Sequence, residues 1–134
     1  MTAENQRTAI AEELTRAASS VEAPRHLAKG GYFNDAVSRL YYFLYHSVKA
    51  LLFTKEFEPR SHEGMLRLLG QHFVKTGLLT PQDSHVLTRL MKYREEADYN
   101  PSYAFTKEDF DELLLAAEAL HAKITQLIER GPTR

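Results

Sequence analysis

The sequence predicts an all-helical protein, folded as an up-and-down antiparallel bundle of about five helices. Apolar residues recur at spacings of three and four along the chain, and no segment of useful length alternates apolar with polar residues as a half-buried strand would. The six glycines and five prolines fall mostly between the periodic segments. Because the 134 residues contain no evident linker or internal repeat, we expect residues 1–134 to form a single domain.

The first half of the sequence predicts two helices. Apolar residues of the first recur at helical spacing, at Ile10, Leu14, Ala17, Ala18 and Val21. Pro24 lacks an amide hydrogen and crowds the preceding turn, so this helix should kink or restart near Pro24 before Gly30-Gly31 ends it. The second helix is expected from about Tyr32 to Thr54.

The second half predicts three further helices. The third starts near residues 61–62, and Gly77 closes it. The fourth follows Thr80-Pro81, because threonine caps a helix and proline suits its first position, and it ends before residues 100–102. A capping-box pattern starts the fifth after Thr106. The apolar positions of the fifth helix are Phe110, Leu113, Leu114, Ala117, Leu120, Ile124, Leu127 and Ile128.

The composition excludes several function classes. The absence of cysteine removes disulfide scaffolds, iron–sulfur clusters, cysteine-ligated zinc and thiol nucleophiles. With 17 Lys and Arg against 18 Asp and Glu, the net charge is −1, so any nucleic-acid contact must come from a local patch. The N-terminal residues lack a signal-peptide pattern, and no apolar run approaches the roughly 20 residues that span a bilayer. We therefore expect a cytoplasmic protein without a membrane contact.

The second predicted helix separates into two faces. Its apolar face consists of Ala36, Val37, Leu40, Tyr41, Leu44, Val48, Leu51 and Leu52. Its polar stripe consists of Asp35, Arg39, Tyr42, His46 and Lys49. Asp35 precedes Arg39 by four residues, the favourable order for a helical ion pair. The stripe fits an ordinary solvated face, but its mixture of aromatic and ionisable groups also suits a groove or a subunit interface.

A second polar cluster ends the fourth predicted helix, in residues 93–101. Arg94 and Asp98 are one turn apart and suit an ion pair. This cluster fits a simple helix stop, and it equally fits a site for phosphate and stacked bases, since arginine and tyrosine serve both. None of the six histidines forms the one-turn histidine pair of zinc hydrolases, and no phosphate-binding loop or nucleophile elbow occurs. We expect neither a metal nor a cofactor.

Five segments combine in one order and spacing: 30–42 (GGYFNDAVSRLYY), 46–52 (HSVKALL), 61–64 (SHEG), 73–79 (FVKTGLL) and 93–99 (YREEADY). This combination covers nearly the whole chain and resembles the small prokaryotic HEPN-domain proteins, named for higher eukaryotes and prokaryotes nucleotide-binding. The resemblance implies a helical bundle that often forms a homodimer, is often encoded beside a minimal nucleotidyltransferase, and in many members acts as a metal-independent ribonuclease toxin.

The family's catalytic signature is an arginine followed after four to six residues by a histidine. Arg94 matches the arginine, but the expected histidine positions hold Tyr99, Asn100 and Pro101. Cleavage through a 2′-hydroxyl needs a group of near-neutral pKa and a fixed cation. Arg94 can supply the cation, and His46 is the attractive substitute base, with Tyr99 a poorer one.

Two functional hypotheses remain open, beside a third, an assembly helper whose surface only forms a dimer. In the leading one, the chain binds RNA or a nucleotide, or docks a minimal nucleotidyltransferase antitoxin, through Arg94, Asp98, Tyr99 and the polar stripe. In the alternative, it is a ribonuclease toxin of a toxin–antitoxin pair that uses Arg94 with His46 or Tyr99. The use of His46 gains support if the second and fourth helices line one cleft, which would place Asp35, Arg39, His46, Arg94 and Tyr99 together across a dimer.

Overall fold

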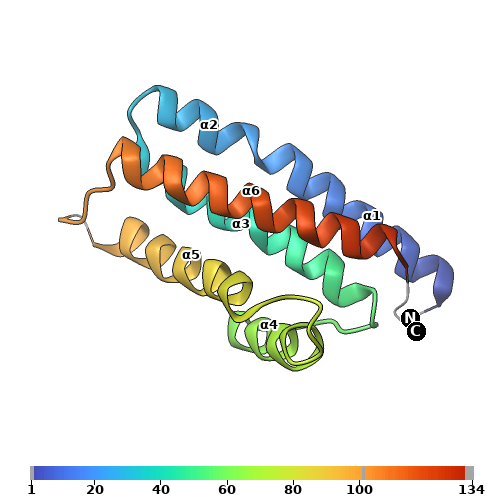
Figure 1. The fold of residues 1–134 in the computed structure, drawn as a ribbon. Coiled ribbons are helices and arrows are strands. Elements are labelled where there is room, and N and C mark those ends of the chain that lie inside the picture. The colour runs from blue at the N-terminus through green and yellow to red at the C-terminus, as the bar shows by residue number, and fades with distance from the viewer. Residues whose placement is uncertain (1, 101, 132–134) are drawn as a thin grey trace.

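Helix α3, Phe33–Phe53, is the central helix of the fold. In the computed structural model, which describes residues 2–100 and 102–131, α3 contacts the other long helices. Those helices are α1 (Ala3–Ser20), α2 (Glu22–Lys29), α5 (Pro81–Tyr99) and α6 (Lys107–Glu129). Figure 1 shows the rod of α1 and α2 running one way, α3 returning, and α5 and α6 repeating the pattern. The predicted all-helical antiparallel bundle is confirmed, without a strand in the described ranges.

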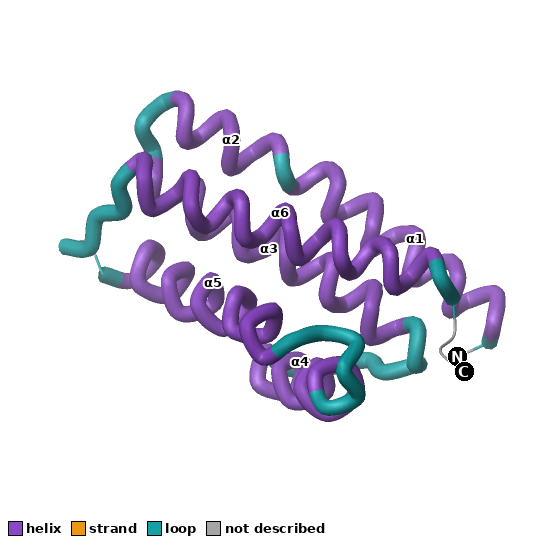
Figure 2. The backbone as a smooth tube through the Cα atoms, viewed as in Figure 1, coloured by secondary structure: helices purple, strands orange, loops and turns teal. Residues whose placement is uncertain are grey.

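The predicted break in the first helix occurs a few residues before Pro24. Helix α1 ends at Ser20 and α2 begins at Glu22, as the short interruption in Figure 2 shows. Pro24 cannot donate to the carbonyl of Ser20, and its ring crowds that carbonyl. Val21 nevertheless keeps helical φ and ψ of −77° and −27°, so α1 and α2 continue as one interrupted rod.

The predicted helix starts are confirmed at two capping boxes. The Thr80 hydroxyl accepts from the Asp83 amide at 3.1 Å, while the Asp83 carboxylate accepts from the Thr80 amide at 2.8 Å. Thr106 and Asp109 repeat this exchange at the start of α6. Helix α5 extends to Tyr99, and Pro101, expected to help stop it, lies outside the described residues. Both starts rest on local hydrogen bonds, which the sequence pattern encodes directly.

The third predicted helix divides into α4, His62–Leu69, and a π-helical turn, Gly70–Val74. The Lys55 ammonium donates to the His72 carbonyl within this turn at 3.2 Å. The Phe73 side chain is buried in the core beneath it. Gly77 adopts a φ of +83° in the loop that leads to α5, which is a conformation that glycine adopts without strain.

The core lies around α3. All eight residues of the predicted apolar face of α3 are buried, and so are Phe43, Ser47, Ala50 and Phe53 on its other sides. Helix α6 buries Phe110, Leu113, Ala117, Leu120 and Ile124 against it. Because neighbours surround α3, its polar stripe is exposed at Asp35 and Arg39 and only partly exposed over the rest of its length. None of the described helices is long and apolar enough to cross a membrane.

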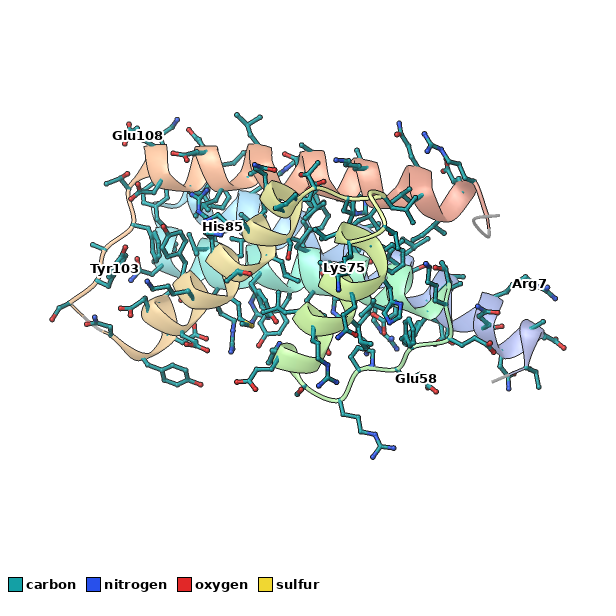
Figure 3. The ribbon with its side chains drawn as sticks, turned by 60° about the horizontal axis from the view of Figure 1, so that its bottom comes forward. Arg7, Glu58, Lys75, His85, Tyr103 and Glu108 are labelled. Atoms are coloured by element: carbon teal, nitrogen blue, oxygen red, sulfur yellow. The ribbon has the colours of Figure 1, made fainter. Side chains whose placement is uncertain are left out.

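One asparagine joins the loop between α5 and α6 to the start of α3. The Asn34 side-chain amide donates to the Tyr103 carbonyl at 2.7 Å, and its oxygen accepts from the Phe105 amide at 2.9 Å. Figure 3 shows Tyr103 in this loop at the end of the bundle. This loop therefore returns the chain against α3 immediately after the polar cluster of α5.

Candidate functional site

A groove of about 670 Å³ lies between the α1–α2 rod, α3 and α5. Its lining residues are Ser20, Leu27, Asp35, Ser38, Arg39, Tyr42, His46 and Asp98. Asp35, Arg39, Tyr42 and His46 come from the polar stripe, because their spacing of three and four residues sets them on one side of α3. Asp98 comes from α5. The structure thus brings five of the sequence-predicted site residues to one groove, lined by the second and fourth predicted helices.

His46 is held by a buried carboxylate on the neighbouring helix α1. The Glu13 carboxylate lies 2.7 Å from His46 Nδ1, 2.8 Å from Arg16 Nη1 and 3.3 Å from Lys49 Nζ. The Glu13 side chain is only 3% exposed. We call Glu13, Arg16, His46 and Lys49 the Glu13 network. Lys49, the remaining residue of the polar stripe, therefore serves this network and does not line the groove.

Sequence reasoning missed Glu13 as a site residue. Its position three residues after Ile10 and four before Ala17 places an acid within the apolar stripe of the first helix. A carboxylate at such a position needs partners when the helix packs. The misplaced acid was the available signal, but two of its three partners, His46 and Lys49, lie 33 and 36 residues further along the chain.

The Glu13 carboxylate is ionised in the folded protein. Burial disfavours its charge, but the hydrogen bond from His46 and the positive charges of Lys49 and His46 outweigh burial and lower the pKa of Glu13 below its ordinary value of 4.5. An ionised carboxylate only accepts hydrogen bonds. His46 Nδ1 must therefore carry the hydrogen in this contact.

The other ring nitrogen of His46 remains available. Its Nε2 bonds to no described residue, and it is not enclosed, because Arg94 Nε is the one buried side-chain polar atom without a partner in the described part of the chain. The His46 side chain is 21% exposed and lines the groove. In the neutral form of His46, Nε2 presents a hydrogen-bond acceptor to solvent there.

Arg94 lies behind the groove and supports its wall. Arg94 Nη1 donates to the Tyr42 hydroxyl at 3.2 Å and lies 3.6 Å from the Asp98 carboxylate, so the predicted Arg94–Asp98 pair forms. The guanidinium carbon is 5.3 Å from the centre of the Tyr41 ring and 5.7 Å from that of Tyr42. This cation–π packing holds Arg94 in place and leaves its buried Nε without a partner.

Tyr41 connects this cluster to His62 on α4. Its hydroxyl is hydrogen-bonded to His62 Nδ1. Burial raises the pKa of Tyr41 above its ordinary value of 10, and the charge of Arg94 only partly offsets this. Tyr41 therefore stays protonated, and the tautomer of His62 sets which of the two groups donates. Tyr41 thus connects Arg94 on α5 with His62 on α4, a structural connection that the sequence analysis did not foresee.

The structure corrects the predicted pairing of Asp35 with Arg39 and places Tyr99 apart from the groove. No ion pair joins Asp35 to Arg39 among the described residues, so the expected helical pair is wrong, and the exposed Arg39 guanidinium is not neutralised there. Tyr99 lies outside the groove, in a shallow depression with Arg94, Glu95, Glu96 and Asn100. Tyr99 is 77% exposed, because it occupies the last residue of α5.

The described residues contain no group of three or more His, Asp or Glu side chains placed to hold a metal ion. What the groove offers is a different chemistry. It combines a guanidinium that no described carboxylate pairs, a tyrosine ring backed by a second guanidinium, and an imidazole whose Nε2 bonds to no described residue. Guanidinium groups bind phosphate, and aromatic rings stack on bases.

Comparison with known proteins identifies the family. Two proteins of Methanocaldococcus jannaschii, each carrying the name "Putative toxin", are similar: one is 36% identical over 75% of this chain and 69% of its own length, the other 31% identical over 90% and 84%. A UPF0332 protein of Thermotoga maritima is 31% identical over 85% of this chain and 86% of its own length. The HEPN domain family matches residues 11–127. This chain, with its antiparallel helices and its segments 30–42 and 93–99 at one groove, therefore belongs to the HEPN domain family.

Proposed function

We propose that this HEPN domain binds single-stranded RNA along the groove between α3 and α5. The observation that carries the proposal is the groove itself, which sets Arg39, Tyr42 and His46 along one side of α3. Arg39 contacts a phosphate, and the Tyr42 ring supports a base. The net charge of −1 leaves these local groups to provide the attraction.

A titration with fluorescently labelled single-stranded RNA at low salt tests RNA binding. Arg39→Gln removes the Arg39 guanidinium and is expected to weaken binding several-fold. Tyr42→Ala removes the ring and is expected to weaken binding by about tenfold, the usual effect of losing one stacked base. Arg7→Gln is the matched control, because Arg7 is an exposed arginine on α1 outside the groove residues. Absence of RNA binding by the folded wild type contradicts the proposal.

A ribonuclease activity is the second candidate function. The observation that favours it is the open Nε2 of His46 in a groove that Arg94 borders through Tyr42. His46 stands in for the histidine that the family signature places after Arg94, and the names of the two archaeal relatives agree with a toxin. Labelled RNA incubated in chelator should then be cleaved by wild type and left intact by Arg94→Ala and His46→Ala. No cleavage by folded wild type leaves RNA binding as the function.

We also propose two protein partners, a second copy of the chain and a minimal nucleotidyltransferase that acts as its antitoxin. The exposed Tyr99 and the shallow surface beside Arg94 suit a protein contact. Light scattering after size exclusion measures the homodimer, and co-purification with a nucleotidyltransferase encoded beside it measures the second partner. A monomer that captures no such enzyme contradicts both. We also propose a cytoplasmic location, where an RNA-binding protein meets its ligand.

A further inference from the structure

The Glu13 network contains more polar contacts than the packing of two helices requires. Helices α1 and α3 already pack through apolar side chains such as Ala17 and Val48. Burying a carboxylate costs free energy that three partners must offset, and an apolar residue of similar volume often serves packing equally well. We therefore expect the network to have a role beyond holding α1 against α3.

The contact with Glu13 determines which tautomer of neutral His46 faces the groove. Since Glu13 accepts the hydrogen of Nδ1, the neutral imidazole must leave Nε2 unprotonated. A hydroxyl donor can bond to such a nitrogen, whereas a phosphate oxygen cannot, because it has no hydrogen to give. A carboxylate that fixes the tautomer of a histidine through its second nitrogen is an established way of setting what the first nitrogen binds.

A phosphate contact with Arg39 would set the position of a bound strand along the groove. Arg39 and His46 are seven residues apart on α3 and line the same groove, with Tyr42 between them. Two helical turns separate them by roughly 10 Å. A strand whose phosphate contacts Arg39 therefore passes its next sugars over His46. The ribose 2′-hydroxyl is the one donor on such a strand that DNA lacks.

We propose that Glu13 is a positioning residue that holds His46 Nε2 as the acceptor for a ribose 2′-hydroxyl, so that the groove selects RNA over DNA. This inference rests on the proposed RNA binding. Glu13 touches no ligand itself and acts only through the tautomer and orientation of His46.

The experiment compares three labelled strands of one sequence: RNA, DNA and 2′-O-methyl RNA. Wild type is expected to bind RNA about two- to tenfold more tightly than either other strand, the effect of one net hydrogen bond. The RNA is checked on a denaturing gel after each titration. In Glu13→Gln, the amide both donates and accepts, so His46 is no longer held in one tautomer and the preference should fall toward one. Glu12→Gln is the matched control, because Glu12 is exposed on the same helix and forms no ion pair among the described residues.

Two further measurements keep the test decisive if Glu13→Gln does not fold. His46→Ala leaves Glu13 with Arg16 and Lys49, and it should abolish the RNA preference while DNA still binds. Nitrogen-15 NMR of the histidine rings, with the His46 signals assigned by their loss in His46→Ala, should show hydrogen on Nδ1 in wild type. That signature reports the tautomer directly and would not change through packing alone.

The outcomes distinguish a failure of the role inferred for Glu13 from a failure of the proposed RNA binding. Three results would overturn the role of Glu13 while RNA binding still stands. They are equal binding of RNA and DNA by wild type, a preference that persists in His46→Ala, and hydrogen on Nε2 in wild type. Failure of wild type to bind any of the three strands overturns the proposed function itself. A preference that Glu12→Gln keeps and Glu13→Gln or His46→Ala loses supports the inference.

Discussion

Individual residues of this bundle differ in how their surroundings set their charge. Glu13 is buried among positive groups and stays ionised, whereas His121 is half-buried against apolar surface and stays neutral. His121 Nδ1 lies 2.6 Å from the hydroxyl of the fully buried Ser47, and its ring packs 4.8 Å from that of Phe43. The two groups therefore respond to acid in separate pH ranges, which makes them separately testable.

His121 should make the free energy of unfolding depend on pH below about 6.5. Burial lowers the pKa of His121 below its ordinary value of 6.5, and the charge of Glu118 offsets this only in part. As pH falls, the unfolded chain takes up this proton first, so stability is lost, with a slope of at most about 1.4 kcal/mol per pH unit. Urea unfolding of His121→Asn, which keeps a polar group beside Ser47, should show a flatter slope between pH 7 and 5. The control His85→Asn, at an exposed site on α5, should keep the wild-type slope, and equal slopes in all three proteins contradict this role.

Glu13 should act in the more acidic range. Because its pKa is lowered from 4.5 in the folded protein, its stabilising charge is complete above pH 4.5 and is lost as pH falls through the folded pKa. At pH 7, we expect Glu13→Gln to unfold with about 2 kcal/mol less free energy than wild type, as for a broken buried pair that keeps one hydrogen bond. This difference should shrink below pH 4.5 when both are measured by chemical unfolding. A constant difference down to pH 3 would show that the charge of Glu13 does not stabilise the fold.

At the scale of elements, α3 combines the main core with one wall of the groove. Leu44 is fully buried at its centre, and Leu115 on α6 is 72% exposed. Leu44→Ala should therefore lower the free energy of unfolding by about 2–5 kcal/mol, since it removes a packed side chain and leaves a cavity. Leu115→Ala should change it by less than about 0.5 kcal/mol. Thermal and urea unfolding measure both, and similar effects at the two sites would be inconsistent with α3 as the central helix.

The element boundaries show which local signals suffice. The boxes at Thr80 and Thr106 begin helices as expected, because their hydrogen bonds join residues three apart. The division of the third helix at Leu69 was not predicted. The π-helical turn after it places Phe73 in the core and the His72 carbonyl beside Lys55 at the end of α3. Contacts between segments distant in the sequence accompany that turn, so no local sequence pattern predicts it.

For the molecule as a whole, the charge balance predicts a modest salt dependence of RNA binding. A protein with a net charge of −1 does not attract a negatively charged RNA strand at a distance. Counterions are therefore released only where the groove contacts phosphates. The slope of log affinity against log salt should be about −0.7 for each phosphate contacted on a single strand. Arg39→Gln should reduce its magnitude by about 0.7 in titrations at several salt concentrations, while Arg7→Gln should not alter it. A slope that Arg39→Gln leaves unchanged would mean that Arg39 contacts no phosphate.

The sequence alone determined the helical class, the faces of α3, the helix starts and the family resemblance. Each of these depends on residues within a few turns of one another, or on segments that can be read in order. Only the tertiary structure decided that α5 closes the groove beside the polar stripe, that Asp35 does not pair with Arg39, and that Glu13 holds His46. These facts depend on how separate helices pack, and buried Glu13 meets His46 and Lys49 across that packing, in addition to Arg16 on its own helix.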